Sequence, residues 1–146
     1  MTTITLLPIE RMYKNNGHHA EQVLTFSLTG ELRKAGNLPF DQGSDIPEFN
    51  LSVKSGGATL MNGKLCTRDT KEGIIDEFIT RSASSNFAFV VKDFSVAYIM
   101  NAIEFRAFCD KFSNIGHDSK QNGGRVKVQI YKQSKKMINW FADMMA

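Results

Sequence analysis

Residues 44–55 combine an acid and a lysine with a short segment in which apolar and polar side chains alternate. Alternation with a period of two is typical of a β-strand and would aim Ser52 and Lys54 at the same face. Asp45, just before the alternating residues, could meet them. Carboxylate oxygens bind hard cations such as Mg²⁺, and a nearby ammonium group orients water and stabilises charge on a phosphate under attack. These residue types predict metal-dependent hydrolysis of a phosphodiester.

A second acid, Glu21, lies in a segment with helical periodicity. Ala20, Val23, Leu24 and Leu28 fall at helical spacing between a breaker at residues 15–17 and Gly30, which predicts a helix over residues 18–29. Glu21 precedes Leu24 and Leu28 by three and seven residues, so it lies beside the apolar stripe. A carboxylate there needs a partner, because burying it alone is costly or forces protonation. A metal ion or a lysine would serve.

The order of a helical Glu, an Asp and a strand ending in Ser-x-Lys resembles the PD-(D/E)XK nuclease superfamily. The resemblance implies a restriction-endonuclease-like fold in which Glu21 is the helical acid, Asp45 the metal-bridging acid and Lys54 the lysine of the final pair. Ser52 occupies the position where the family usually has Asp or Glu. The string Leu51-Ser52-Val53-Lys54-Ser55 looks like the Ser-x-Lys-Ser variant of some restriction endonucleases. The family's proline precedes its acid, whereas Ile46-Pro47 follows Asp45.

The same resemblance implies a ligand set and an activity. Asp45, Glu21 and the backbone carbonyl of Val53 would hold Mg²⁺, with Mn²⁺ as a substitute, and Ser52 or water would complete the oxygen shell. Lys54 would position the attacking water and stabilise the transition state. Glu48, which shares strand parity with Lys54, ranks below Glu21 as an alternative ligand. The expected activity is that of an Mg²⁺-dependent DNA endonuclease of a small restriction or mobile-element type.

Each of these residues also has a plain structural explanation. Asp45 fits a turn acid before a proline, Glu21 an exposed residue at a helix start, and Lys54 a surface lysine on an edge strand. Loss of the acid at Ser52 leaves open a non-catalytic DNA-binding or protein-interaction module that keeps the nuclease fold. A small regulatory protein of a mobile element is a further alternative.

Residues 119–142 are basic and contain no acid. They predict contacts to DNA phosphates, although a solvated basic surface that aids solubility explains them equally well. Gln121 and Asn122 would read base edges if their loop enters a groove. A domain of this size covers both strands of a duplex by dimerising, so we expect a homodimer or a partner subunit, whereas a monomer would nick. The basic residues are Lys120, Arg125, Lys127, Lys132, Lys135 and Lys136.

The overall composition fits one domain over residues 1–146. The chain has 146 residues and a formal net charge of +3, enough for a single core. No run approaches the ~20 apolar residues of a membrane span, and the first residues lack the features of a signal peptide, so we expect a cytoplasmic protein. Cys66 and Cys109, without metal-site spacing, predict reduced and partly buried thiols.

Helical and strand periods alternate along the rest of the chain, which predicts a mixed α/β fold with a central mixed sheet flanked by helices. Residues 114–124 are predicted to form a polar loop that contains His117. His18 and His19 are expected either to be exposed at a helix start or to contact phosphate. Helices are expected over residues 70–81 and 103–112 and after Ser134, and strands over 38–40, 45–54, 86–91, 96–100 and 126–131, with 86–91 and 96–100 forming a hairpin.

Overall fold

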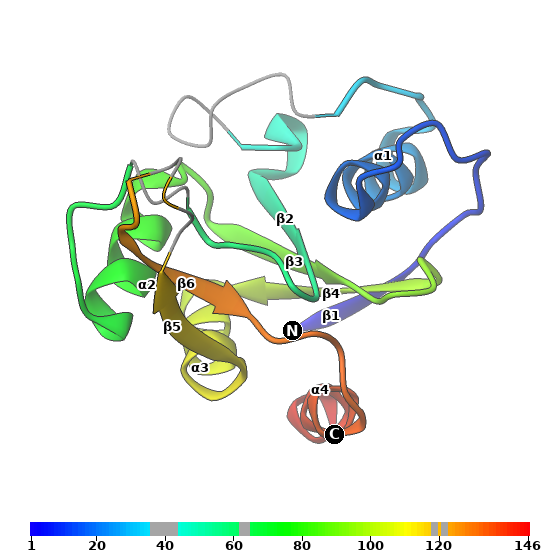
Figure 1. Cartoon of the computed structure of the whole chain (residues 1–146). Helices are drawn as coiled ribbons and strands as arrows, with labels where there is room; N and C mark the ends of the chain where they lie inside the picture. The colour runs from blue at the N-terminus through cyan, green and yellow to red at the C-terminus, as the bar shows by residue number, and fades with distance from the viewer. Residues whose placement is uncertain (36–43, 62–64, 118–119, 121–122) are drawn as a thin grey trace.

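The computed structural model describes residues 1–35, 44–61, 65–117, 120 and 123–146 (Figure 1). Within them, four helices accompany a four-stranded mixed sheet and a two-stranded hairpin, which confirms the predicted mixed α/β class. The helices are α1 (Asn16–Thr29), α2 (Lys71–Arg81), α3 (Ala102–Phe112) and α4 (Lys135–Met145), with a 3-10 turn, η2 (Pro47–Phe49). The strands are β1 (Thr2–Thr5), β2 (Leu51–Ser55), β3 (Asn86–Val90), β4 (Val96–Asn101), β5 (Ser113–His117) and β6 (Val126–Ile130).

The larger sheet has the strand order β1-β4-β3-β2, which places β2 at an edge. β2 and β3 are parallel and joined through α2, whereas β3 and β4 form the predicted antiparallel hairpin. The register pairs Ser52 with Phe87 and Lys54 with Phe89. Phe87 and Phe89 contribute to the same core cluster, so the prediction that Ser52 and Lys54 share a face of the sheet is confirmed.

Apolar side chains cover both faces of this sheet. On one face, α1 packs Ala20, Val23 and Leu24 against a cluster that includes Leu51 and Val90. Helices α2, α3 and α4 and strand β6 cover the opposite face, and Figure 1 shows α1 on one side of the sheet and α3 and α4 on the other. The face under α2 to α4 is rich in aromatic rings, which are Phe78, Phe87, Phe89, Phe105, Phe108, Phe112 and Phe141.

Polar caps set the helix ends. The side chain of Asn15 accepts a hydrogen bond from His18 N, so α1 begins two residues before its predicted start, and Gly30 ends it in a left-handed conformation at φ 76°. Asn101 and Glu104 form a capping box on α3, and Ser134 caps α4 as predicted. Within the described residues, no helix is long and apolar enough to cross a membrane.

Three segments depart from the sequence-based expectations. The strand expected from residue 45 begins only at Leu51, because Pro47 starts a 3-10 turn and Asn50 adopts a left-handed φ of 51°. The predicted loop over 114–124 is wrong in part, since its first residues belong to β5, which pairs with β6. Strand β1 was not expected from the sequence. The strand expected over 38–40 lies outside the described residues.

Candidate functional site at the open edge of β2

The backbone of β2 presents alternate residues to the open edge of the sheet. The backbone carbonyl of Asn50 accepts a hydrogen bond from Asn86 N at 3.1 Å, so the backbone N–H and C=O groups of even-numbered residues point toward β3. Those of Leu51 point the other way and make two backbone hydrogen bonds with Ile46, at 3.0 and 3.2 Å. The segment before η2 therefore folds back along the edge of β2.

Asp45 lies on this returning segment, and its Oδ2 accepts a hydrogen bond from Val53 N at 2.7 Å. The N–H and C=O groups of one strand residue point to the same side, so the Val53 carbonyl also faces the Asp45 side of the strand. The residue as a whole is exposed, but its carboxyl group lies against β2. This burial raises the pKa of Asp45, and the hydrogen bond from Val53 and the charge of Lys54 act against the rise.

The side chain of Lys54 extends from β2 toward Phe78, on the face of the sheet that α2 to α4 cover. Its Nζ donates hydrogen bonds to the carbonyl oxygens of Thr59 and Leu60, at 3.0 and 3.2 Å, and lies 4.9 Å from the centre of the Phe78 ring. Burial lowers the pKa of Lys54, and attraction to Asp45 is the strongest opposing influence. Lys54 therefore lies on an edge strand, as its plain explanation has it, but it is half-buried and its ammonium group is bonded to the protein.

Glu21 occupies a half-buried position on α1. Its negative charge acts to raise the pKa of Lys54, as that of Asp45 does more strongly. Cys109 stays neutral, because burial raises the pKa of its thiol to about 12. Of the three residues singled out from the sequence, Asp45 acts on the charge of Lys54 most strongly and Glu21 more weakly.

Ser52, at the position of the missing acid, belongs to a cluster of serines. It is buried, and its hydroxyl is hydrogen-bonded to the hydroxyl of Ser84 at 2.7 Å. Ser84 in turn donates to Ser44 Oγ at 2.8 Å, and Ser44 Oγ donates to the carbonyl of Ala83 at 3.2 Å. The position is filled by a neutral network that ties β2 to the end of α2.

Two secondary expectations about this region are corrected. Glu48 does not share strand parity with Lys54, because it lies in η2, where Arg33 binds it and holds the pKa of Glu48 at about 2. His19 is not exposed: it is buried and packs edge-on against Phe94, with ring centroids 4.5 Å apart. Burial, and then the charge of Arg11, lowers the pKa of His19.

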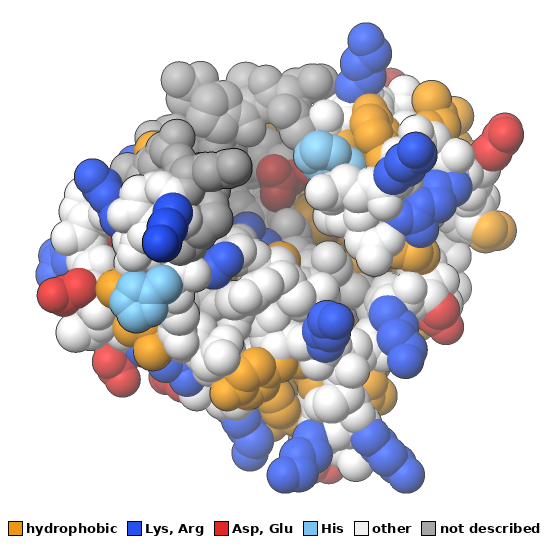
Figure 2. Space-filling view, viewed as in Figure 1, with side chains coloured by type: hydrophobic (Ala, Val, Ile, Leu, Met, Phe, Trp, Pro, Cys, Tyr) orange, Lys and Arg blue, Asp and Glu red, His pale blue; other side chains and the backbone are white. Residues whose placement is uncertain are grey.

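The basic end of the chain is spread over several elements. Lys120, Arg125, Lys132, Lys135 and Lys136 are exposed, whereas Lys127 is half-buried on β6. Figure 2 shows basic side chains distributed over one face of the molecule around a central hollow. Gln121 and Asn122 lie outside the described residues, so their expected role in reading bases stays a prediction.

The oxygen donors at the edge of β2 match the needs of a Mg²⁺ ion. Among the residues that the structure describes, no three His, Cys, Asp or Glu side chains are grouped to hold a metal ion by themselves. Mg²⁺, however, is commonly bound through one or two carboxylates, with waters and substrate phosphates completing its shell. The Asp45 carboxylate and the Val53 carbonyl lie on the same side of β2, whereas Glu21 lies on α1.

A second feature, a pocket beside this edge, carried no sequence signal. Its walls come from four separate parts of the chain and include Ser55, Lys92 and Lys132. Only the fold brings these parts together, and Lys92 sits in a hairpin turn, where a lysine is common.

Comparisons of the chain with protein-family models, with curated proteins and with solved structures found no match.

Proposed function

We propose that this protein is a divalent-metal-dependent endonuclease that hydrolyses DNA phosphodiester bonds on a restriction-endonuclease-like arrangement of residues. The observation that supports this function best is the position of Asp45, which Val53 N holds at 2.7 Å and which acts more strongly than Glu21 on the charge of Lys54. Ionisable groups with pKa values shifted by burial and by specific partners are enriched at catalytic sites. Opposite charges held together next to an open strand edge suit a substrate that is itself an anion.

Asp45 and Glu21 would hold the cation, with the Val53 carbonyl as a further oxygen ligand. A bound Mg²⁺ polarises a phosphate and lowers the pKa of a coordinated water. The hydrogen bond from Val53 N fixes the Asp45 carboxylate by one of its oxygens, Oδ2, and leaves the other to accept a ligand. The contact of this carboxylate with β2, which raises its pKa, also reduces the water that competes with a cation.

Lys54 would act on the phosphate. Two of its three N–H donors are directed at Thr59 and Leu60, which fixes the ammonium group and leaves one donor for a water or a phosphate oxygen. A fixed charge costs no reorganisation when negative charge develops in the transition state. The ring of Phe78 beneath it contributes a further favourable contact to the cation.

A non-catalytic DNA-binding module is the second candidate, and the serine network favours it. In this network, Ser52 takes the place of an acid and is bonded to Ser84. A module of this kind would bind DNA without divalent metal and leave it intact.

Cleavage of supercoiled plasmid DNA by the purified protein, with Mg²⁺ or Mn²⁺, tests the proposed function. We expect conversion by the wild type and none by Asp45→Asn or Lys54→Met. The matched control, Asp143→Asn, removes an exposed acid from α4 and should cleave normally. A nicked product would indicate a monomer and a linear product a dimer. Intact plasmid with shifted mobility in all four proteins would instead establish the binding module.

A further inference from the structure

A pocket of about 300 Å³ lies beside the open edge of β2. It opens where the parallel strands β2 and β3 end. Ser55 and Gly56 line it at the end of β2, and Val91 and Lys92 line it just after β3. Crevices outside the carboxyl ends of parallel strands bind ligands in doubly wound sheets, and β2 and β3 are a parallel pair within this mixed sheet. The volume is at the lower end of the range for small-molecule sites.

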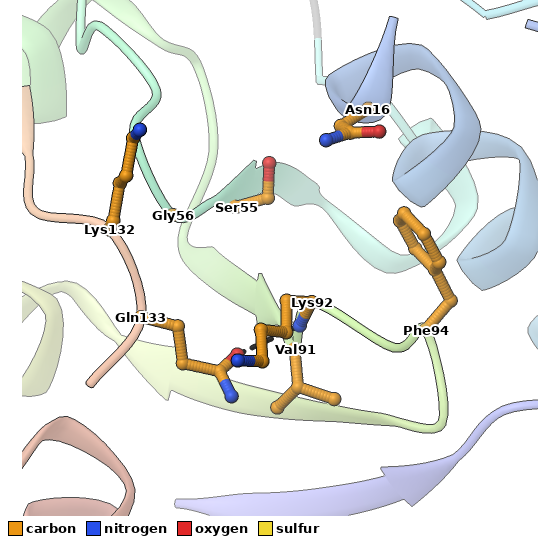
Figure 3. Close-up of a pocket in the computed structure, with 8 residues that line it drawn as sticks. All are labelled: Asn16, Ser55, Gly56, Val91, Lys92, Phe94, Lys132 and Gln133. Carbon is orange, nitrogen blue, oxygen red and sulfur yellow. Dashed lines mark hydrogen bonds between the residues drawn. The ribbon is translucent and has the colours of Figure 1, made fainter. Parts of the chain in front are cut away.

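The lining of the pocket is positively charged. Lys92 and Lys132 both contribute to it, and none of its eight described lining residues is acidic. In Figure 3, Lys132 stands on one side, Asn16 and Phe94 on the other, and Ser55 between them. Two ammonium groups match the charge of a phosphate, which carries between one and two negative charges near neutral pH.

Ser55 adds an uncommitted donor. The residue is 9% exposed, and its hydroxyl makes no hydrogen bond to the residues that the structure describes. Figure 3 shows this hydroxyl pointing toward the space between Lys132 and Asn16. It is not among the buried polar atoms that lack a partner, so it reaches solvent and is available to donate to a bound oxygen atom.

The walls of the pocket are fixed to one another. Lys92 N donates a hydrogen bond to Gln133 Oε1 at 2.8 Å, which ties the β3–β4 turn to the segment after β6. A Cβ atom at Gly56 would lie only 2.7 Å from Gln133 N, so the end of β2 touches the same segment. Phe94 keeps a left-handed φ of 57°, a conformation that is costly for a bulky residue and points to a site of constraint.

The first turn of α1 completes the arrangement. Asn16 belongs to this turn, which contains no acidic residue. The amide groups at a helix N-terminus favour anions, so α1 acts in the same direction as the two lysines.

We propose that this pocket binds a phosphate group, held by Lys92, Lys132 and the hydroxyl of Ser55. The phosphate comes either from a nucleic-acid backbone or from a free phosphate or mononucleotide. Because the pocket uses none of Glu21, Asp45 and Lys54, phosphate binding persists in Asp45→Asn even if that variant no longer cleaves DNA. Failure of one proposal is therefore distinguishable from failure of the other.

Titration of the ¹⁵N-labelled protein with inorganic phosphate, followed by amide NMR shifts, tests this site. We expect saturable shifts centred on the amides of Gly56, Lys92 and Gln133, and at least tenfold weaker binding by Lys132→Ala and by Lys92→Ala. Lys111→Ala is the matched control, because it removes an exposed charge from the last turn of α3, and it should bind like the wild type.

A second titration, with a short single-stranded oligonucleotide and with a 5′-mononucleotide, distinguishes the two sources. Tighter binding of the oligonucleotide through the same amides assigns the pocket to a nucleic-acid backbone, and tighter binding of the mononucleotide assigns it to a free ligand. Shifts that map elsewhere, or equal phosphate affinities in Lys132→Ala and Lys111→Ala, would overturn the site.

Discussion

Burial shifts the pKa values of Asp45 and Lys54 in opposite directions, and both shifts disfavour the charged form. The raised pKa of Asp45 means that the folded protein binds its proton more tightly than the unfolded chain does. Stability contributed by this group is therefore lost as pH rises above the unfolded value of about 4. A bound cation would reverse this effect, because it favours the ionised carboxylate.

Replacement of Asp45 by Asn should remove this pH dependence. The amide oxygen of Asn can still accept the hydrogen bond from Val53 N, so the fold should persist. We expect the difference in free energy of unfolding between Asp45→Asn and wild type to move in favour of the variant as pH rises from about 4 to 7. Urea unfolding followed by the fluorescence of Trp140, in metal-free buffer, measures it.

The control for this measurement is Asp143→Asn, which should show no comparable trend. Identical pH profiles for Asp45→Asn and wild type would mean that the Asp45 carboxyl is as well hydrated in the folded protein as in the unfolded chain. The electrostatic account of the site would then lose its basis.

At the scale of elements, periodicity predicted the parts of the fold that bury a regular apolar stripe. Helices α2, α3 and α4 and the β3–β4 hairpin lie where the sequence places them. Strands β1 and β5 were missed because their short, polar sequences become strands only by pairing with β4 and β6. Glu48 was misplaced because Pro47 and Asn50 interrupt the expected alternation.

The stability of the fold should be sensitive to a methyl group added where the end of β2 contacts the segment before α4. Gly56→Ala places a Cβ atom 2.7 Å from Gln133 N, in contact with backbone rather than with a flexible side chain. We expect a loss of about 1–3 kcal/mol in the free energy of unfolding, as for other overpacked sites. Thermal unfolding monitored by circular dichroism provides the measurement.

Gly116→Ala is the matched control, because a Cβ atom at Gly116 meets nothing within 4 Å. Its stability should stay close to that of the wild type. Equal stability of Gly56→Ala and wild type would show that the connection between β2 and α4 yields easily, and that the walls of the pocket are not fixed as described.

At the scale of the whole molecule, the distribution of charge determines how strongly the protein binds a polyanion such as DNA. The formal net charge is only +3, so attraction to DNA depends on where the basic residues lie. The basic end could be predicted from the sequence but the pocket could not, because Lys92 and Lys132 are distant along the chain and line it together only in the folded protein. Glu21 and Lys54 could be predicted because they lie in regular helical and strand patterns, and Asp45 because it directly precedes the strand pattern.

The salt dependence of DNA binding should locate the basic surface. Each phosphate contact releases counterions, so the slope of log K against log salt changes by about 0.9 for each lost contact. We expect Lys135→Ala/Lys136→Ala to reduce this slope by about two on a short duplex in EDTA. Fluorescence anisotropy at several salt concentrations measures it.

The control double variant, Lys14→Ala/Lys111→Ala, has the same net charge but alters exposed lysines elsewhere in the chain. It should keep the wild-type slope. If both double variants lower the slope equally, DNA responds to overall charge and the start of α4 is an ordinary solvated surface.

The proposed function requires that Asp45, together with Glu21, holds a divalent cation. Titration of the protein with Mn²⁺, with free Mn²⁺ measured by electron paramagnetic resonance, tests it most directly. The wild type and Asp143→Asn should each bind one Mn²⁺ per chain, and Asp45→Asn should bind at least tenfold more weakly. Equal Mn²⁺ binding by Asp45→Asn and wild type, or no binding by either, would contradict the claim.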